Sequence, residues 1–369
     1  MSTQLQLRRG TTAQHSTFTG ASGEITIDTD KKTVVVHDGI TPGGRALSQF
    51  DPSRSNRIIN GAMMIDQRNA GASVVNSAGS TYFIDRWTIY DGSGGSHFTV
   101  QRNKDSVTPP AGYTNYLGIQ TTTALSAAAG NNLTLTQYIE GFNTSDLGWG
   151  AVGAASVTVS FWVRSSLTGT FAGQLQSGNN DATYVFNYTI NSANTWEQKT
   201  ITIAGPTIGM WYAGTNNRSI ACRFDLGCGS TFAGTANTWS ASTLLTTSGA
   251  VALVGTLNAT FYITGVQLEK GSVATPFEFR PYGTELALCQ RYYQPIYGFI
   301  RGASSSAIGS TGFTKVAMRA APTLAGTAYQ GTSFVLGAGI ADTTGSWYVQ
   351  ATSAVNGIVE YSGTASAEL

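Results

Sequence analysis

Short stretches with alternating apolar and polar residues constrain the fold of this chain more than any other feature. In residues 157–163 every second side chain is Val or Phe, and the residues between them occupy the other face of an extended chain. The same alternation returns in residues 182–190 and 260–264, and turns rich in Gly, Asn and Ser separate the stretches. Because antiparallel sheets commonly bury one face and solvate the other, the pattern predicts an antiparallel β-sandwich or jelly roll over residues 57–283.

A small β-rich module is predicted ahead of the sandwich, in residues 1–50. Residues 24–28 and 33–37 are two strand-like runs joined by a polar turn, which predicts a hairpin. A module of this size buries little apolar surface by itself, so we expect copies of the chain or a partner to complete its core. Residues 51–56 are interpreted as a linker.

One short helix and a second small β-rich domain are predicted after the sandwich. The helix covers residues 284–294, with Thr284 as its N-cap, Glu285 in its first turn and Pro295 preventing its continuation. Residues 295–369 contain further strand-like runs and are interpreted as a terminal β domain at the tip of the chain. The predicted fold class is therefore all-β.

The composition excludes several classes of partner. Only 11% of the residues are charged, 44 are Gly and the net charge is +1. No basic block suggests nucleic acid. No apolar run approaches the length of a membrane span or opens the chain as a signal peptide, so we expect synthesis in a cytoplasm and no membrane insertion. A surface of neutral polar groups nevertheless favours a protein that works outside the cytoplasm.

The cysteines leave two alternatives open. Cys222 and Cys228 could pair across a hairpin, or these two and Cys289 could all be reduced and packed as small apolar residues.

Motifs of enzymes are scarce, and no cofactor, metal site or catalytic residue is predicted. The three histidines make a His-based nucleophilic triad improbable. Two carboxylates facing one cleft could hydrolyse a glycan. The candidates for such a pair are Glu140, Asp146, Asp181, Glu197 and Asp225.

Aromatic residues among small polar ones suggest glycan binding. Sugars present CH faces that stack on aromatic rings, and loops on a rigid sandwich are frequent binding sites. The alternative is that these rings cap the sandwich core or fill subunit interfaces. The glycan-binding candidates are Trp149, Trp211, Tyr212, Trp239 and Trp347.

Sequence motifs in three regions resemble tail proteins of bacteriophages. Residues 8–11 (RRGT), 23–28 (GEITID) and 36–45 (VHDGITPGGR) resemble the N-terminal module of phage tail fibres and receptor-binding proteins, including the major tropism determinant group. The central region resembles a jelly-roll module of phage tail proteins that is similar to carbohydrate-binding modules; the motifs are 57–63 (RIINGAM), 85–87 (DRW) and 264–271 (TGVQLEKG). Residues 289–293 (CQRYY) with 318–323 (MRAAPT) are typical of the same tail proteins.

The resemblance implies a homotrimeric virion component that is assembled in the host cytoplasm. Residues 1–50 would bind other phage tail proteins, and the remainder would attach to a glycan or protein of the host surface without acting as an enzyme. Two alternatives stay open: a tail spike that depolymerises polysaccharide, and a purely structural connector or decoration protein.

Overall fold

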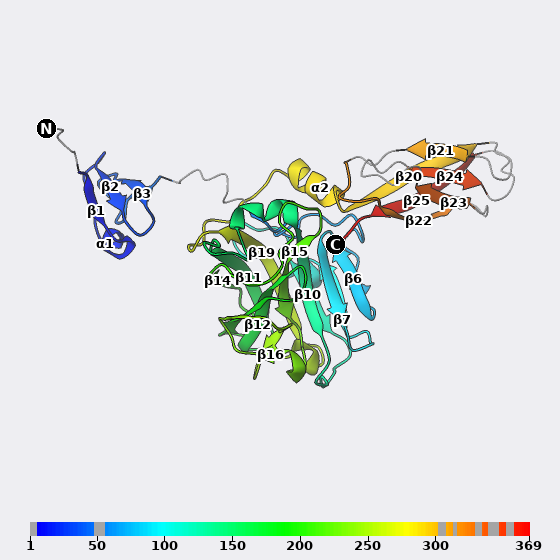
Figure 1. The fold of residues 1–369 in the computed structure, drawn as a ribbon, viewed down its shortest axis with the longest axis horizontal. Helices are drawn as coiled ribbons and strands as arrows, with labels where there is room; N and C mark the ends of the chain where they lie inside the picture. The colour runs from blue at the N-terminus through cyan, green and yellow to red at the C-terminus, as the bar shows by residue number, and fades with distance from the viewer. Residues whose placement is uncertain are drawn as a thin grey trace. The chain divides into compact units, whose positions relative to one another are not determined.

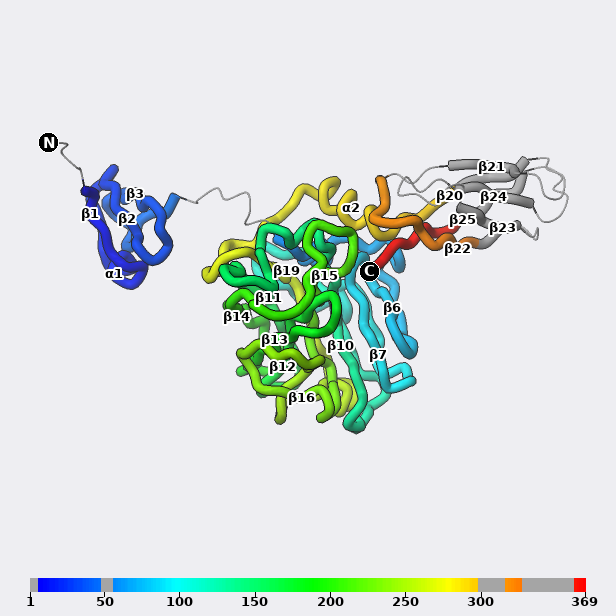
Figure 2. Tube along the Cα trace, in the orientation of Figure 1, coloured from blue at the N-terminus to red at the C-terminus, as the bar shows by residue number. Residues whose placement is uncertain are grey.

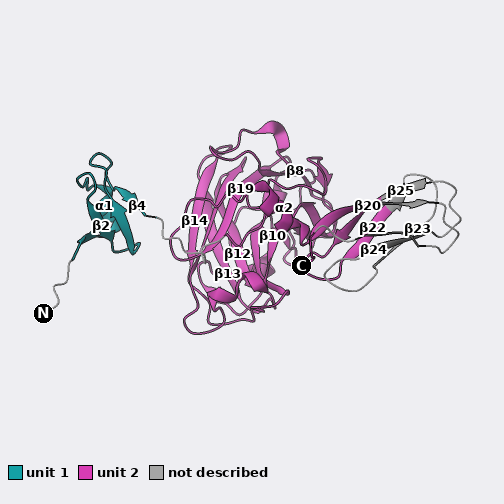
Figure 3. Ribbon diagram, turned by 90° about the horizontal axis from the view of Figure 1, so that it is seen from above, with its two compact units in different colours: residues 1–54 teal, residues 55–369 magenta. Residues whose placement is uncertain are grey.

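The computed structural model describes residues 6–47, 56–301, 308–312, 316–328, 334–338, 347–351 and 358–369, and describes side chains in residues 6–47, 56–297, 316–326 and 362–369. The chain divides into two units, residues 1–54 and 55–369, which are coloured separately in Figure 3. Among the described residues, no helix is long and apolar enough to cross a membrane.

The N-terminal unit is a four-stranded sheet with one short helix. The order in the sheet is β1-β2-β3-β4, with β1 parallel to β2. The predicted hairpin is present as β2 and β3. Helix α1 begins with a capping box between Thr11 and Gln14. The elements are β1 (Arg8–Gly10), α1 (Thr12–Ser16), β2 (Ile25–Asp28), β3 (Thr33–Val36) and β4 (Arg45–Ala46).

A hydrogen-bonded chain of buried polar side chains lies between α1 and the sheet. The Gly20 N–H donates to Nδ1 of His37, so Nε2 of this ring is the donor to the Thr26 hydroxyl at 2.9 Å. That hydroxyl donates to Nε2 of His15 at 2.8 Å, and Nδ1 of His15 donates to the Thr11 carbonyl oxygen. Both histidines are therefore structural in this unit.

The opposite face of the same sheet is apolar and partly exposed. Ile25 pairs with Val36 and Ile27 pairs with Val34, so these four side chains share one face. Ile25 is 45% exposed, and Leu7, just before β1, and Leu47, just after β4, are also exposed. The unit thus buries polar groups under its helix and leaves aliphatic groups partly exposed. It therefore has little apolar core of its own, as its size predicts.

The predicted antiparallel sandwich is confirmed in residues 55–369 (Figure 1). One sheet has seven strands in the order β17-β13-β12-β15-β10-β7-β6, and the other has six in the order β14-β11-β19-β9-β8-β5. The seven strands are β6 (Gly79–Ile84), β7 (Trp87–Asp91), β10 (Leu133–Glu140), β12 (Gly169–Ser177), β13 (Thr183–Ile190), β15 (Arg218–Asp225) and β17 (Trp239–Ser240). The six are β5 (Val74–Val75), β8 (Phe98–Arg102), β9 (Leu117–Thr121), β11 (Val157–Ser165), β14 (Glu197–Ile203) and β19 (Thr260–Lys270). A separate pair, β16 (Ala233–Gly234) and β18 (Thr246–Thr247), is parallel.

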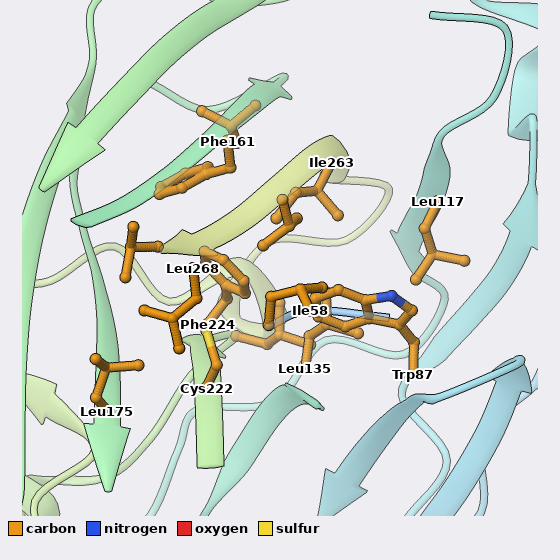
Figure 4. Close-up of a cluster of buried hydrophobic side chains, with 14 of the residues drawn as sticks. Ile58, Trp87, Leu117, Leu135, Phe161, Leu175, Cys222, Phe224, Ile263 and Leu268 are labelled. Atoms are coloured by element: carbon orange, nitrogen blue, oxygen red, sulfur yellow. The ribbon is translucent and has the colours of Figure 1, made fainter. Parts of the chain in front are cut away.

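The core lies between the two sheets and follows the alternation in the sequence. All four apolar residues of positions 157–163 are fully buried, and Phe161 meets Tyr188 and Phe224 edge-on with ring centroids 5.1 and 4.9 Å apart. Figure 4 shows Phe161, Phe224 and Leu268 in this cluster. Such edge-to-face pairs add to the free energy of burial.

Truncating Phe161 should destabilise the sandwich strongly. We expect Phe161→Ala to lower the free energy of unfolding by about 3–5 kcal/mol, because it removes a fully buried ring from a rigid core. Urea unfolding followed by tryptophan fluorescence measures this change. The control is Thr189→Ala, an exposed position of β13, which should stay within about 0.5 kcal/mol of wild type. Equal effects of the two variants would contradict the assigned core.

The three cysteines are free. Cys222 is fully buried in the sandwich core and Cys289 in the contact of α2 with the sandwich. Burial raises the pKa of the Cys222 thiol to about 12, which makes it unreactive. Cys222 and Cys228 are therefore not paired, and the alternative of three reduced cysteines holds, with Cys228 only partly buried.

The helix begins and ends earlier than predicted. Helix α2 covers Tyr282–Gln290 with Pro281 at the N-cap position, so Thr284 lies inside the helix instead of capping it. The fixed φ of Pro281 suits a helix start, and its carbonyl oxygen accepts from the backbone N–H groups of Thr284 and Glu285. The chain is already extended at Tyr293, so Pro295 lies within a strand. Instead of needing symmetry mates, α2 packs on the sandwich side chains Ile59 and Ile65.

The C-terminal segment leaves and rejoins the sandwich at one place. Strands β20 and β25 are antiparallel, and Tyr293 at the start of one pairs with Ser366 at the end of the other (Figures 1 and 2). The two sheets of this segment have the orders β20-β25-β22 and β21-β24-β23. The strands are β20 (Tyr293–Arg301), β21 (Ile308–Gly312), β22 (Thr323–Ala328), β23 (Phe334–Ala338), β24 (Trp347–Ala351) and β25 (Ile358–Ser366).

Candidate functional site

Three of the predicted glycan-binding tryptophans meet in the folded chain. Trp149 follows a 3-10 turn (Ser145–Leu147), Trp211 precedes β15, and Trp239 begins β17. Their ring centroids are 4.6 Å apart for Trp149 and Trp211, 5.7 Å for Trp149 and Trp239, and 5.6 Å for Trp211 and Trp239, all edge-on. Residues that are 90 positions apart in the sequence therefore form one aromatic cluster.

The cluster is mostly buried, and its polar atoms are already satisfied. Trp149 is 9% exposed and Trp211 is 5% exposed, while Trp239 is half-buried. Their indole N–H groups donate to the carbonyl oxygens of Ala155, Ile208 and Ala204, respectively. Trp149 and Trp211 thus pack at the edge of the sandwich core, which is the alternative to glycan binding that the sequence left open. Contact of either ring with a sugar stays a prediction.

Tyr212 is the predicted residue with the most unusual backbone. Its φ is +43°, a region that bulky side chains rarely adopt. Two glycines make room for it: a Cβ on Gly141 would lie 2.0 Å from the Tyr212 carbonyl oxygen, and one on Gly178 would lie 2.8 Å from the Tyr212 ring. The ring is half-buried and its hydroxyl reaches Asn179 Oδ1 at 3.4 Å. Strain of this kind is found preferentially at functional sites.

Polar side chains of the turn between β12 and β13 and of the start of β15 lie near Tyr212. Asn179 and Asn180 are exposed at the turn between β12 and β13, and Arg218 donates to Asn180 Oδ1 at 2.9 Å. Asp181 organises this turn by accepting from Ser177, Asn179 and the Met210 N–H. Burial acts to raise the pKa of Asp181, but these hydrogen bonds outweigh it and lower the pKa. Amides and a guanidinium bind sugar hydroxyls, and an aromatic ring packs against sugar CH faces.

Trp347 begins β24 in the C-terminal segment. Its side chain lies outside the described residues, so its predicted role stays a prediction.

The candidate catalytic carboxylates each hold a separate part of the structure. Glu140 accepts from Arg291 at 2.6 Å and from the Tyr292 hydroxyl, and Asp146 accepts from Arg57 at 2.8 Å. Glu197 pairs with Lys199 at 2.6 Å, and Asp225 accepts from the backbone N–H groups of Gly227 and Cys228. None of these contacts joins two of the five acids, so they give no support to a hydrolytic pair.

Sequence reasoning missed Asn179, Asn180 and Arg218. The run of Gly178, Asn179, Asn180 and Asp181 is a recognisable turn signal between two alternating stretches. Nothing in the sequence indicates that this turn meets residues 208–218, because that contact depends on how the strands pair.

Each similar protein matches only part of this chain. The tail fiber receptor-binding protein of Bordetella phage BPP-1 is 69% identical over 51 residues, which are 14% of this chain and only 13% of that protein. The I1 variant of the major tropism determinant is 31% identical over 35% of this chain and 41% of its own, with a TM-score of 0.14. Tailspike protein 4 of bacteriophage CBA120 is 13% identical and covers 58% of this chain and 21% of its own, with a TM-score of 0.32. TmCBM61, solved with β-1,4-galactotriose, is 10% identical over 59% of this chain and 99% of its own, with a TM-score of 0.30.

The family comparison concerns the N-terminal unit. Residues 5–41 match the model of the major tropism determinant N-terminal domain. This stretch contains the motifs of residues 8–11 and 23–28 and most of the motif of residues 36–45. The resemblance indicated by these motifs is therefore confirmed: residues 5–41 are similar in sequence to the major tropism determinant N-terminal domain.

Proposed function

We propose that this chain is a receptor-binding subunit of a phage tail fibre and that it attaches the virion to a glycan of the host surface. The N-terminal match and the name of the 69% identical relative support the tail-fibre part of the proposal. The observation that carries the glycan part is Tyr212, whose strained backbone holds a partly exposed ring among Asn179, Asn180 and Arg218. The neighbouring residue Trp211 belongs to the buried tryptophan cluster, which supplies a rigid support for this part of the chain.

The assembly that we propose is a homotrimer joined through the N-terminal unit, which also binds other tail proteins in the virion. The partly exposed apolar face of the four-stranded sheet supports self-association, because a face of this composition is unfavourable in water. Three copies would present three weak sites together, and this multivalency would raise the avidity for a cell surface.

The test of host attachment is adsorption competition. Purified protein is added to susceptible cells before the phage, and we expect wild type to block adsorption and Tyr212→Ala to block it about tenfold less well, because one stacking ring contributes on the order of 1 kcal/mol or more. The matched control is Tyr90→Ala, which removes an exposed tyrosine from β7 and should compete like wild type.

The same experiment separates the alternatives. Wild-type protein that does not bind susceptible cells would contradict attachment and leave a structural role in the virion. Release of reducing sugar from host polysaccharide during the incubation would instead favour a depolymerase.

A further inference from the structure

Two arginines flank one tyrosine on the outer face of the seven-stranded sheet. Tyr138 lies in β10, next to β15, and pairs in register with Ala221. The guanidinium carbon of Arg218 lies 5.1 Å from the centroid of the Tyr138 ring, and that of Arg223 lies 5.8 Å from it. In a chain with only 11% charged residues, two cations on one ring are a notable concentration of positive charge.

Neutral groups hold both guanidinium groups. Arg218 donates through Nε and Nη2 to the Gly178 carbonyl oxygen and through Nη2 to Asn180. Arg223 donates through Nη1 to Gln176 Oε1. Within the described part of the chain, no carboxylate lies within 4.0 Å of either group, although other arginines, such as Arg291 with Glu140, are paired in this way. Positive charge that is partly removed from water and left without an anion is unfavourable, unless a ligand supplies the anion.

The two arginines differ in exposure, which gives the cluster an open side and a closed side. Arg223 is 8% exposed, and burial lowers its pKa. Arg218 and Tyr138 are half-buried, so a ligand can reach them from solvent. The Nη1 group of Arg218 donates to no other described residue, and it is available to an incoming oxygen.

This cluster is continuous with the candidate glycan site. Arg218 contacts Asn180 and Gly178, and the Tyr212 ring lies directly against Gly178. A sugar stacked on Tyr212 would therefore place its neighbouring substituents close to Arg218.

We propose that Arg218, Tyr138 and Arg223 bind an acidic group, so that the ligand is an anionic glycan. A guanidinium matches the two oxygens of a carboxylate or of a phosphate or sulfate ester, and the positive charge of Arg223 behind the ring favours the anion further. The inference rests on the proposed function, because it names the chemical class of the glycan bound at Tyr212.

The experiment is binding of the full-length protein to an array of immobilised bacterial surface glycans. The array contains neutral glycans, glycans with uronic or sialic acids, and glycans with phosphate or sulfate groups, and the last two classes distinguish the source of the anion. We expect wild type to bind acidic glycans selectively and to bind them less tightly as sodium chloride increases. Arg218→Gln should weaken this binding about tenfold or more, because a charge-assisted hydrogen bond is lost.

The matched control is Arg164→Gln on the other sheet. Arg164 also lies over a tyrosine ring, at 5.0 Å from Tyr262, and donates to a loop carbonyl oxygen, that of Asn194. It should bind acidic glycans like wild type. Selective binding of neutral glycans that is lost in Tyr212→Ala and kept in Arg218→Gln would overturn the anionic ligand and preserve glycan attachment at Tyr212. Binding to no glycan would overturn both proposals.

Discussion

Replacing Glu368 by Gln is expected to destabilise residues 55–369 by about 3–5 kcal/mol, because it breaks a buried ion-pair network. Glu368 accepts from Arg68 at 2.7 Å and from Arg86, whose side chain is 1% exposed. Burial acts to lower the pKa of Arg86, but the Glu368 carboxylate, together with smaller contributions from two tyrosines and Cys289, outweighs it and raises the pKa. Without that carboxylate, two guanidinium groups stacked on Tyr293 and Tyr292 lose their counter-charge inside the protein.

The position of Glu368 in the chain increases the consequence. It lies just after β25, at the point where the C-terminal segment rejoins the sandwich, and Ala367 donates its N–H to the Tyr292 carbonyl oxygen there. Loss of the ion pairs should therefore release the last residues and weaken the base of the whole C-terminal segment. Limited proteolysis near the C-terminus should become faster than in wild type.

Urea unfolding followed by tryptophan fluorescence measures the effect in this unit selectively, because all seven tryptophans lie after residue 55. The control is Lys270→Gln, which removes the charge from a pair with Asp146 at 3.5 Å whose side chains are 32% and 35% exposed. It should change stability by less than about 1 kcal/mol, since exposed ion pairs contribute little. Similar midpoints for the two variants would refute the role of the buried network.

Replacing Ile25 by Asp is expected to convert the proposed trimer into monomers. Ile25 is 45% exposed on the apolar face of the N-terminal sheet, so the monomer tolerates a carboxylate there. In a trimer, each copy would lose about 1.5–3 kcal/mol of side-chain burial and would place an unpaired charge in the interface. Light scattering coupled to size-exclusion chromatography measures the mass of both proteins.

The matched control for this variant is Ile40→Asp. Ile40 is 84% exposed in the turn between β3 and β4, away from the apolar face, and its replacement should leave the mass unchanged. A wild-type mass equal to one chain would refute the trimer. A trimer that survives Ile25→Asp would show that the subunits associate through another surface.

The sequence determined the sheets because alternation is a local property. Once Val157, Val159, Phe161 and Val163 are in an extended chain, their side chains must share a face, and burial of that face selects a sandwich. The same reasoning predicted the hairpin of the N-terminal unit and the shortage of core within it. The helix boundary was wrong by two residues at its start, because Thr284 as an N-cap competed with Pro281 and the proline defined the first turn.

The candidate site could be predicted only in part from the sequence, for a different reason. Residue type singled out Trp149, Trp211, Tyr212 and Trp239, but burial and strain are properties of the packed structure. Only the tertiary structure placed Trp149 and Trp211 at the edge of the sandwich core, forced Tyr212 to φ +43°, and brought Asn180 to Arg218.

What the sequence by itself determined about this protein is therefore what neighbouring residues can specify: extended strands, their buried faces, the turns between them, and the motifs of residues 5–41. What only the tertiary structure decided is which distant residues meet. The register of β10 against β15 sets Tyr138 between Arg218 and Arg223, and the return of β25 to β20 brings Glu368 to Arg86. Such contacts depend on the summed packing of whole sheets, so no short stretch of the sequence contains them.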